Sequence, residues 1–177
     1  MLTVLVTGGC SPAARRIAAA LRQGGASVRL TDRPAAAARA DAGEGLVPCG
    51  LDDGPETLAL LDAVDYIVHL EPALALPAHD GAGGWLDICT RCTYNLLYAA
   101  AEASGVVGCL CMSTTALYAD YGPSVMPEPE WQPRPTCEPD QLGPHLAEWI
   151  ARQYAATGAL QVRPTHTRRT SASPAAA

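Results

Sequence analysis

The chain has 177 residues, which is enough for one domain with a sizeable core, and its length alone suggests no second domain. Hydrophobic residues make up 49% of it, as in globular rather than disordered proteins. The formal net charge is -6, which argues against a nucleic-acid or anionic-membrane partner. All 12 basic residues are arginines, so any mechanism that needs a lysine amine is excluded.

The N-terminus and the cysteines indicate the cellular compartment. Residues 1–6 are apolar but too few and too uncharged for a signal peptide. No run approaches the roughly 20 apolar residues of a membrane span. The seven cysteines are an odd count without an export signal, which favours reduced thiols over disulfides. We therefore expect a soluble, cytoplasmic protein.

The first half of the chain alternates predicted strands with predicted helices. Residues 2–6 form a continuous apolar run, which is typical of a strand buried on both faces. Ser11 and Pro12 predict a helix start, with serine as the N-cap and proline at the first helical position. In chain order we predict a strand over 2–6, a helix over 12–23, a strand over 27–31, a short helix over 35–42, a strand over 46–49 and a helix over 57–64.

The second half continues this alternation. We predict a strand over 65–70, a loop to about residue 84, a helix over 85–104, a strand over 106–112, a proline-rich loop over 119–143, a helix over 144–156 and a strand over 160–163. Strands that alternate with helices predict right-handed crossovers and a parallel sheet covered on both faces. The predicted fold class is therefore α/β, a doubly wound parallel sheet over residues 1–164. Residues 165–177 are polar and alanine-rich and are predicted to be a disordered tail.

A glycine turn follows the first predicted strand. In doubly wound sheets ligands bind beyond the carboxyl ends of the strands. Thr7, Gly8 and Gly9 lead into a helix N-terminus, whose free N–H groups suit a pyrophosphate. Ser11, however, stands where a glycine would let the pyrophosphate approach, its hydroxyl competes for one N–H, and Pro12 lacks another. We predict a weakened phosphate site, with an ordinary strand-to-helix turn as the alternative.

Asp32 lies 24 residues after Gly8, at the end of the second predicted strand. A carboxylate there can accept both hydroxyls of an adenosine ribose and would repel a 2′-phosphate, which favours NAD over NADP. Three arginines, Arg15, Arg16 and Arg33, weaken this preference because any of them could pair with an additional phosphate. The alternative interpretation of Asp32 is a solvated turn residue.

Six short motifs occur in a specific order. They are Val6-Thr7-Gly8-Gly9, Thr31-Asp32-Arg33, residues 64–70 (VDYIVHL), residues 95–100 (NLLYAA), residues 113–118 (STTALY) and Val162-Arg163-Pro164. Together they make the chain resemble the NAD-dependent epimerase/dehydratase family, the extended short-chain dehydrogenases, from Met1 to about Pro164. The resemblance implies a Rossmann-type NAD(P)-binding domain, with the cofactor beside Thr7, Gly8, Gly9, Ser11, Asp32, Arg33, His69 and Leu70. It also implies that the family's substrate-binding region would continue beyond this chain, which resembles a truncated member.

The resemblance further implies a catalytic set: a Ser or Thr after the fifth strand, then a Tyr and a Lys four residues apart on the next helix. Thr114 matches the first position. When Glu148 is aligned with the acidic residue that commonly follows the lysine, Asp140 and Pro144 stand at the other two positions. A shift of one residue places Gln141 and His145 there instead. We therefore expect Thr114 to be the only remnant of the catalytic set, and catalysis to be impaired.

Four cysteines, Cys89, Cys92, Cys109 and Cys111, raise the possibility of a zinc site. Cys89 and Cys92 lie in the first turns of the predicted long helix, and Cys109 starts the following strand at the opposite edge of the sheet. A helix of about 18 residues is roughly 27 Å long, which argues against a shared zinc ion. Buried thiols that pack as small apolar side chains are favoured, with a redox Cys-x-x-Cys pair at a helix start as the alternative. We expect no metal site.

Three functional hypotheses remain. The first is a cofactor-binding protein with impaired catalysis, and the second is an active NAD-dependent oxidoreductase or epimerase whose catalytic groups are replaced and which acts on a nucleotide-sugar or small carbonyl compound. The third is an interaction module that kept only the fold. His69 is expected to pack and hydrogen-bond beside the cofactor rather than act as a base. Tyr118 and Tyr121 could replace the lost acid/base group, but with no cation nearby we expect their pKa to stay near 10. The expected partner is the dinucleotide. The resemblance also implies that a full-length relative dimerises through the two helices that flank the site, and a homodimer of this chain is left open.

Overall fold

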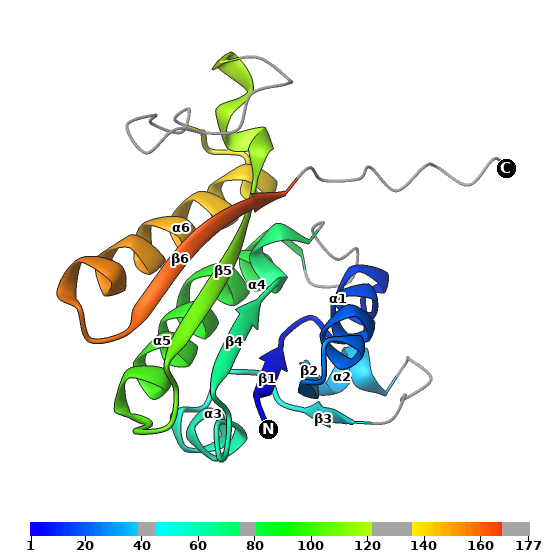
Figure 1. Ribbon diagram of the computed structural model, residues 1–177. Coiled ribbons are helices and arrows are strands. Elements are labelled where there is room, and N and C mark those ends of the chain that lie inside the picture. Colours follow the sequence, from blue (N-terminus) through cyan, green and yellow to red (C-terminus); the bar gives the residue numbers. More distant parts are fainter. Residues whose placement is uncertain (39–44, 75–80, 122–135, 168–177) are drawn as a thin grey trace, which may run out of the picture.

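The computed structural model describes residues 1–38, 45–74, 81–121 and 136–167. Within these ranges the strands form a single parallel sheet in the order β3-β2-β1-β4-β5-β6 (Figure 1). The strands are β1 (Thr3–Val6), β2 (Ser27–Asp32), β3 (Leu46–Pro48), β4 (Tyr66–His69), β5 (Gly108–Thr114) and β6 (Gln161–Thr167). The strand order reverses between β1 and β4, so the predicted doubly wound α/β fold is confirmed.

Helices connect these strands in the predicted alternation. They are α1 (Pro12–Gln23), α2 (Pro34–Ala37), α3 (Gly54–Leu60), α4 (Gly81–Asp87), α5 (Thr93–Glu102) and α6 (Pro139–Thr157), with the short turns η1 (Glu71–Ala73), η2 (Ile88–Cys92) and η3 (Thr115–Tyr121). The π-helical turn η2 joins α4 to α5, so the single helix predicted over 85–104 is one continuous helical segment that begins earlier, at Gly81.

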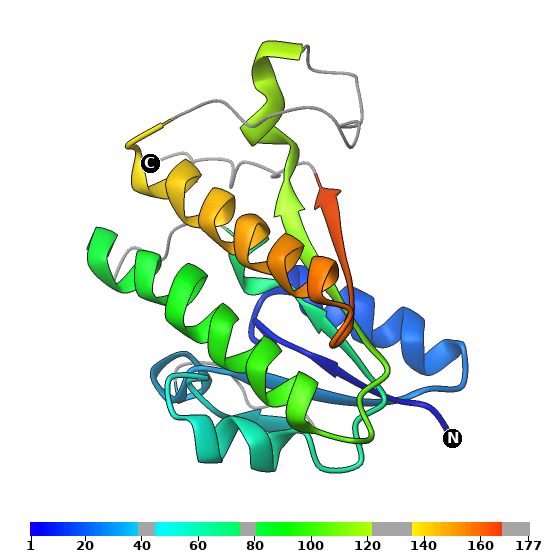
Figure 2. The ribbon, with the colours of Figure 1, turned by 90° about the vertical axis from the view of Figure 1, so that its left-hand side faces the viewer.

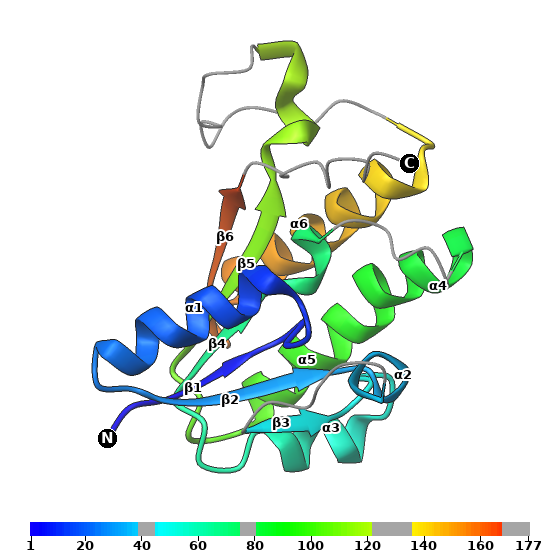
Figure 3. The same cartoon turned by 90° about the vertical axis from the view of Figure 1, so that its right-hand side faces the viewer.

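Helices cover both faces of the sheet, and a separate buried apolar cluster lies on each face. On one face Leu5 and Ile67 belong to a buried cluster with residues of α3, α5 and α6. Figure 2 shows α5 and α6 side by side on this face. On the other face Val6 packs against Ala14 and Ala18 of α1, which lies in front of the sheet in Figure 3. The alanine side chains are small, so the α1 backbone can approach the strands closely and bring its N-terminus to the end of β1.

The start of α6 differs from the prediction. The helix begins at Pro139, five residues before the expected start at Pro144, which lies inside it. Pro139 occupies the first helical turn, where a missing N–H costs nothing. Pro144 removes one hydrogen bond from the second turn, and its buried side chain packs in the interior.

The last strand also differs from the prediction. β6 pairs with β5 as far as Thr167, three residues into the segment expected to be a disordered tail. Every residue of β5 thereby gains a partner strand. The rest of that tail, residues 168–177, and the later part of the short helix predicted over 35–42 lie outside the described residues. None of the helices in the described ranges is long and apolar enough to cross a membrane.

Candidate functional site

The turn after β1 depends on two glycines. Gly8 has a φ of 67°, a conformation that side chains disfavour. The N–H of Gly9 donates to the carbonyl of Thr31 at 2.8 Å, and a Cβ on Gly9 would lie 3.0 Å from the Leu30 Cβ. The turn therefore packs directly on β2, which places the N-terminus of α1 at the carboxyl edge of the sheet.

Ser11 caps α1 as predicted. Its hydroxyl accepts the N–H of Ala14 at 3.1 Å, and Pro12 follows at the first helical position. One N–H at this helix end is therefore absent and another is already paired, although a bound phosphate would need such groups. This is the arrangement from which we predicted a weakened phosphate site.

Asp32 lies at the end of β2 beside this turn and is only 6% exposed. One carboxylate oxygen accepts the N–H of Cys10 and the other accepts the N–H of Arg33, both at 2.8 Å. Asp32 is thus buried and ties the glycine turn to β2, so the alternative of a solvated turn residue is wrong. Burial and the Asp32 carboxylate raise the pKa of the Cys10 thiol to about 11, which keeps that thiol protonated.

His69 is fully buried at the end of β4. Its Nδ1 lies 2.9 Å from the hydroxyl of Thr7, and its Nε2 lies 2.9 Å from the hydroxyl of Thr93. The Thr7 oxygen accepts the N–H groups of Leu70 and Glu71 at 3.0 and 3.4 Å, which leaves its own hydrogen for Nδ1. The Thr93 hydroxyl donates to the Ile88 carbonyl, so its oxygen accepts the Nε2–H. Burial lowers the pKa of His69 to about 3. The imidazole is neutral with both nitrogens paired, and it packs and hydrogen-bonds as predicted.

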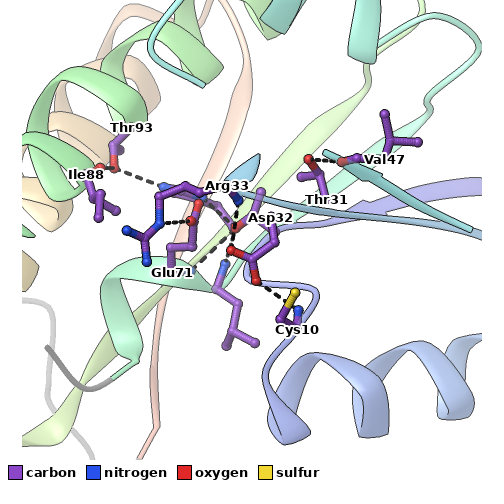
Figure 4. A network of polar contacts seen from close by, with 11 residues as sticks. Cys10, Thr31, Asp32, Arg33, Val47, Glu71, Ile88 and Thr93 are labelled. Atoms are coloured by element: carbon purple, nitrogen blue, oxygen red, sulfur yellow. Dashed lines mark hydrogen bonds and ion pairs between the residues drawn. The ribbon is translucent and has the colours of Figure 1, made fainter. Parts of the chain in front are cut away.

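Glu71 was singled out for no role by sequence reasoning, yet it lies among the predicted cofactor residues. It follows β4 in η1 and is only 6% exposed. Its carboxylate lies 3.9 Å from the Arg33 Nε, and the two side chains point toward each other beside Asp32 (Figure 4). Burial and the neighbouring Asp32 carboxylate raise the pKa of Glu71, Arg33 and a hydrogen bond with Thr7 oppose the shift, and the net result is a pKa of about 8. The available signal was an acidic residue directly after a buried strand, at the edge where ligands bind.

A cavity of about 50 Å³ lies in front of the glycine turn, lined among the described residues by Gly8, Asp32, Arg33, Glu71, Leu74, Trp85 and Ile88. The side chains of Glu71 and Leu74 lie directly in front of Gly8.

Thr114, the expected remnant of the catalytic set, ends β5. It is fully buried, and its hydroxyl accepts the N–H of Ala116 at 3.2 Å. The two pairs that we expected at the Tyr and Lys positions, Asp140 with Pro144 and Gln141 with His145, all lie in the first turns of α6. Thr114, at the end of β5, is turned into the protein.

A buried polar cluster around Glu148 lies next to Thr114. Glu148 in α6 is 4% exposed and binds side chains from β5, η3, β6 and its own helix. Its partners are Ser113 at 2.9 Å, Tyr118 at 2.6 Å, Arg152 at 2.6 Å and His166 at 2.9 Å. Burial by itself would raise the pKa of Glu148, but the hydrogen bonds from His166, Tyr118 and Arg152 outweigh it and lower the pKa to about 2. Glu148 is therefore ionised.

Tyr118 has a cation nearby, contrary to our expectation. The Arg152 guanidinium lies 3.4 Å from the phenolic oxygen. Burial and the hydrogen bond to the Glu148 carboxylate nevertheless raise the pKa of Tyr118 well above its usual value, and Arg152 only partly offsets this. The phenol therefore remains protonated and donates to Glu148. The side chain of Tyr121 lies outside the described part of the structure.

The four cysteines considered for zinc are buried. Cys92, Cys109 and Cys111 belong to the same apolar cluster, and Cys89 packs beside Trp85. Within the described ranges, no three side chains of the metal-ligand type come together. Burial raises the pKa of Cys92 to about 12, which keeps it from acting as a redox thiolate.

Comparison with solved structures extends these observations. A short-chain dehydrogenase/reductase superfamily protein from Agrobacterium tumefaciens, with bound NAD, is 27% identical and superposes with a TM-score of 0.72 over 94% of this chain and 48% of that one. UDP-glucose 4-epimerase from Thermus thermophilus, in complex with NAD, has a TM-score of 0.75 at 20% identity, over 94% and 54% of the two chains. dTDP-glucose 4,6-dehydratase from Bacillus anthracis, in complex with NAD, has a TM-score of 0.73 at 17% identity, with the same coverage.

The chain thus spans about half the length of these structures. No curated protein matches its sequence. The model of the NAD-dependent epimerase/dehydratase family matches residues 4–168, which include β1 from Val4 onward, the other five described strands and all the site residues described above. The chain therefore belongs to the NAD-dependent epimerase/dehydratase family.

Proposed function

We propose that the protein binds NAD across the carboxyl ends of β1, β2 and β4. The observation that carries this proposal is the position of the Asp32 carboxylate, hydrogen-bonded to the loop that follows Gly8 and Gly9. Backbone groups of the turn would hold the pyrophosphate, and Asp32 would accept the hydroxyls of the adenosine ribose. The relative from Agrobacterium tumefaciens, which carries NAD, supports this choice of ligand.

Catalysis, in this proposal, is impaired. Bound NAD would supply a hydride acceptor, but the chain's own residues must move the proton. Asp140 and Pro144 provide neither a phenol nor an ammonium group. Tyr118 is the described phenol closest to Thr114 in sequence, and its pKa is raised rather than lowered by burial and Glu148. A protonated phenol that donates to a carboxylate cannot serve as a base near pH 7.

The test of binding is a titration of NADH followed by its fluorescence. We expect wild type to bind, and Asp32→Ala to weaken binding about tenfold or more, because a charged hydrogen bond contributes about 1.5–3 kcal/mol. Asp62→Ala removes an exposed carboxylate outside the site and is the control. Equal affinities for wild type and Asp32→Ala would contradict the proposed site. No binding by wild type would favour an interaction module instead.

The test of impairment is turnover. Purified protein with NAD and UDP-glucose, or a small carbonyl compound with NADH, should show no change in absorbance at 340 nm or in product analysis above the protein-free control. Robust conversion that depends on the cofactor would show an active oxidoreductase or epimerase with replaced catalytic groups.

We also propose that two copies of the chain associate through α5 and α6. The two helices lie side by side on the outside of the molecule (Figure 2). Their outer surface carries Tyr94, Tyr98 and Trp149, which are between 49% and 57% exposed. Large aromatic residues are enriched in protein interfaces, so this stripe is the surface that a second copy would cover.

A further inference from the structure

We propose that Glu71 occludes the dinucleotide cleft of its own chain, so that NAD binds only after the Glu71 side chain has left the space in front of Gly8. This inference rests on the proposed function and adds a residue that controls access to the same site.

The steric part of the argument comes from the surroundings of Gly8. A Cβ on Gly8 would lie 3.3 Å from the Glu71 Cγ and 2.8 Å from the Leu74 Cδ1. Gly8 forms the tight turn of the dinucleotide site, and the pyrophosphate would lie beside it. Here two side chains occupy the space in front of Gly8, and a cavity of about 50 Å³ lies beside them.

The electrostatic part adds to the steric one. The pyrophosphate of NAD carries two negative charges, so a Glu71 that loses its proton while it stays beside them in a buried space would be repelled strongly. Glu71 already lies close enough to Asp32 for that carboxylate to raise its pKa. Arg33, 3.9 Å away, is the cation that faces Glu71. When the Glu71 side chain rotates away, the pyrophosphate of the ligand takes its place beside Arg33.

The backbone shows which part moves. The N–H groups of Leu70 and Glu71 both donate to the Thr7 hydroxyl, at 3.0 and 3.4 Å. The start of η1 is therefore fixed to the end of β1. Rotation of the Glu71 side chain, rather than displacement of the strand end, is the movement that opens the cleft.

Occlusion makes binding depend on pH. The charged or titratable groups that face Glu71 are Asp32 and Arg33 at the end of β2, Cys49 after β3 and Cys92 in η2, while His69 in β4 is neutral. Burial, reinforced by Asp32, raises the pKa of the occluding carboxyl from 4.5 to about 8. Between about pH 4.5 and pH 8 the occluding carboxyl therefore holds a proton, and it releases this proton when the side chain becomes exposed. Raising the pH from 5 to 8 favours the open form and tightens NAD binding, by up to about tenfold per pH unit.

The experiment is a titration of NAD at pH 6 and pH 8 with wild type, Glu71→Ala, Glu71→Gln and the control Glu102→Ala, which removes an exposed carboxylate at the end of α5. We expect Glu71→Ala to bind at least tenfold more tightly than wild type at pH 6, with little change at pH 8. Glu71→Gln keeps the bulk without the titration, so its affinity should stay weak and nearly independent of pH. Glu102→Ala should follow wild type.

Two results would overturn the occlusion. The first is a folded Glu71→Ala variant that binds NAD no more tightly than wild type. If wild type binds NAD, this result contradicts only the occlusion. If neither protein binds NAD, it contradicts the proposed function as well. The second uses no ligand. Because the folded pKa is raised, the thermal stability of wild type should fall relative to Glu71→Gln as pH rises from 5 to 8; parallel curves would show that Glu71 is not buried as a carboxylic acid.

Discussion

At the residue scale, the number of donors that reach a buried group decides its protonation state. Glu71 and Glu148 are both nearly inaccessible. Glu71 has one arginine at 3.9 Å and a second carboxylate nearby, so the desolvation cost of its charged form prevails. Glu148 receives hydrogen bonds from four side chains, which together overcome the same cost. The pKa is therefore raised for Glu71 and lowered for Glu148, so the stability that each residue contributes changes with pH in opposite directions.

Removal of the Glu148 charge should weaken the fold. Glu148→Gln leaves Arg152 and His166 without their carboxylate, and breaking a buried ion pair costs about 3–5 kcal/mol; because Arg152 is half-exposed, we expect about 2–3 kcal/mol in urea unfolding at pH 7. The folded pKa is lowered, so this contribution is complete above about pH 4.5 and is lost as pH falls toward 2. Glu102→Gln is the control, and equal losses at pH 3 and pH 7 would contradict the assignment.

At the element scale, close packing positions α6 against the α4–α5 segment. A Cβ on Gly143 would lie 2.7 Å from the Trp85 Nε1 and 2.9 Å from the Cys89 Sγ. These atoms belong to α4 and η2, which contact α6. Gly143 therefore lets the first turns of α6 approach the other helix, and this approach carries Glu148 to the ends of β5 and β6. The early start of α6 at Pro139 is what places Gly143 within the helix.

Two glycine substitutions in helices should have opposite effects. Gly143→Ala forces a methyl group onto Trp85 and Cys89, and we expect a loss of about 1–3 kcal/mol of unfolding free energy. Gly83→Ala in α4 meets nothing within 4 Å and should stabilise the protein by up to about 1 kcal/mol through helix propensity. Thermal and urea unfolding would measure both. A gain for both variants would mean that α6 does not pack on Trp85.

At the scale of the whole molecule, the sheet collects the ends of β1, β2, β4 and β5 at one edge, while the two helices packed on β4–β6 remain exposed on their outer side. The candidate site therefore lies at the carboxyl edge of the sheet, whereas the proposed contact surface lies on the helices that cover one of its faces. Tyr94 stacks on Tyr98 with ring centroids 6.0 Å apart and meets Tyr154 of α6 edge-on at 6.2 Å. The aromatic stripe is thus continuous from α5 to α6.

Replacement of this stripe should change the oligomeric state. We expect wild type to sediment as a dimer in analytical ultracentrifugation and the double variant Tyr98→Ser/Trp149→Ser as a monomer, with unfolding temperature measured in parallel. Tyr66→Ser alters a tyrosine of similar exposure on β4, away from both helices, and should leave the dimer intact. A wild-type monomer at micromolar concentration would show that this stripe does not bind a second copy.

Local sequence patterns predicted much of the fold and the cofactor side of the site. The apolar run before Gly8, the serine-proline helix start and the acidic residue at the end of the second strand are features of neighbouring residues, and the structure places each where it was expected. Periodicity located the other elements to within a few residues. The exceptions were the ends of β6 and the start of α6, because strand pairing and helix packing extend elements beyond what local preference indicates.

Residue identity and short spacing were enough to predict the alternation of strands and helices and the turn at Gly8, and they show that the chain has no lysine. Only the tertiary structure decided the states of Glu71 and Glu148. A carboxyl's pKa depends on which distant groups share its buried space, and Glu148 meets Ser113 across 35 residues of chain. Spacing along the sequence does not predict this contact, because it forms only when β5, β6 and α6 have packed together.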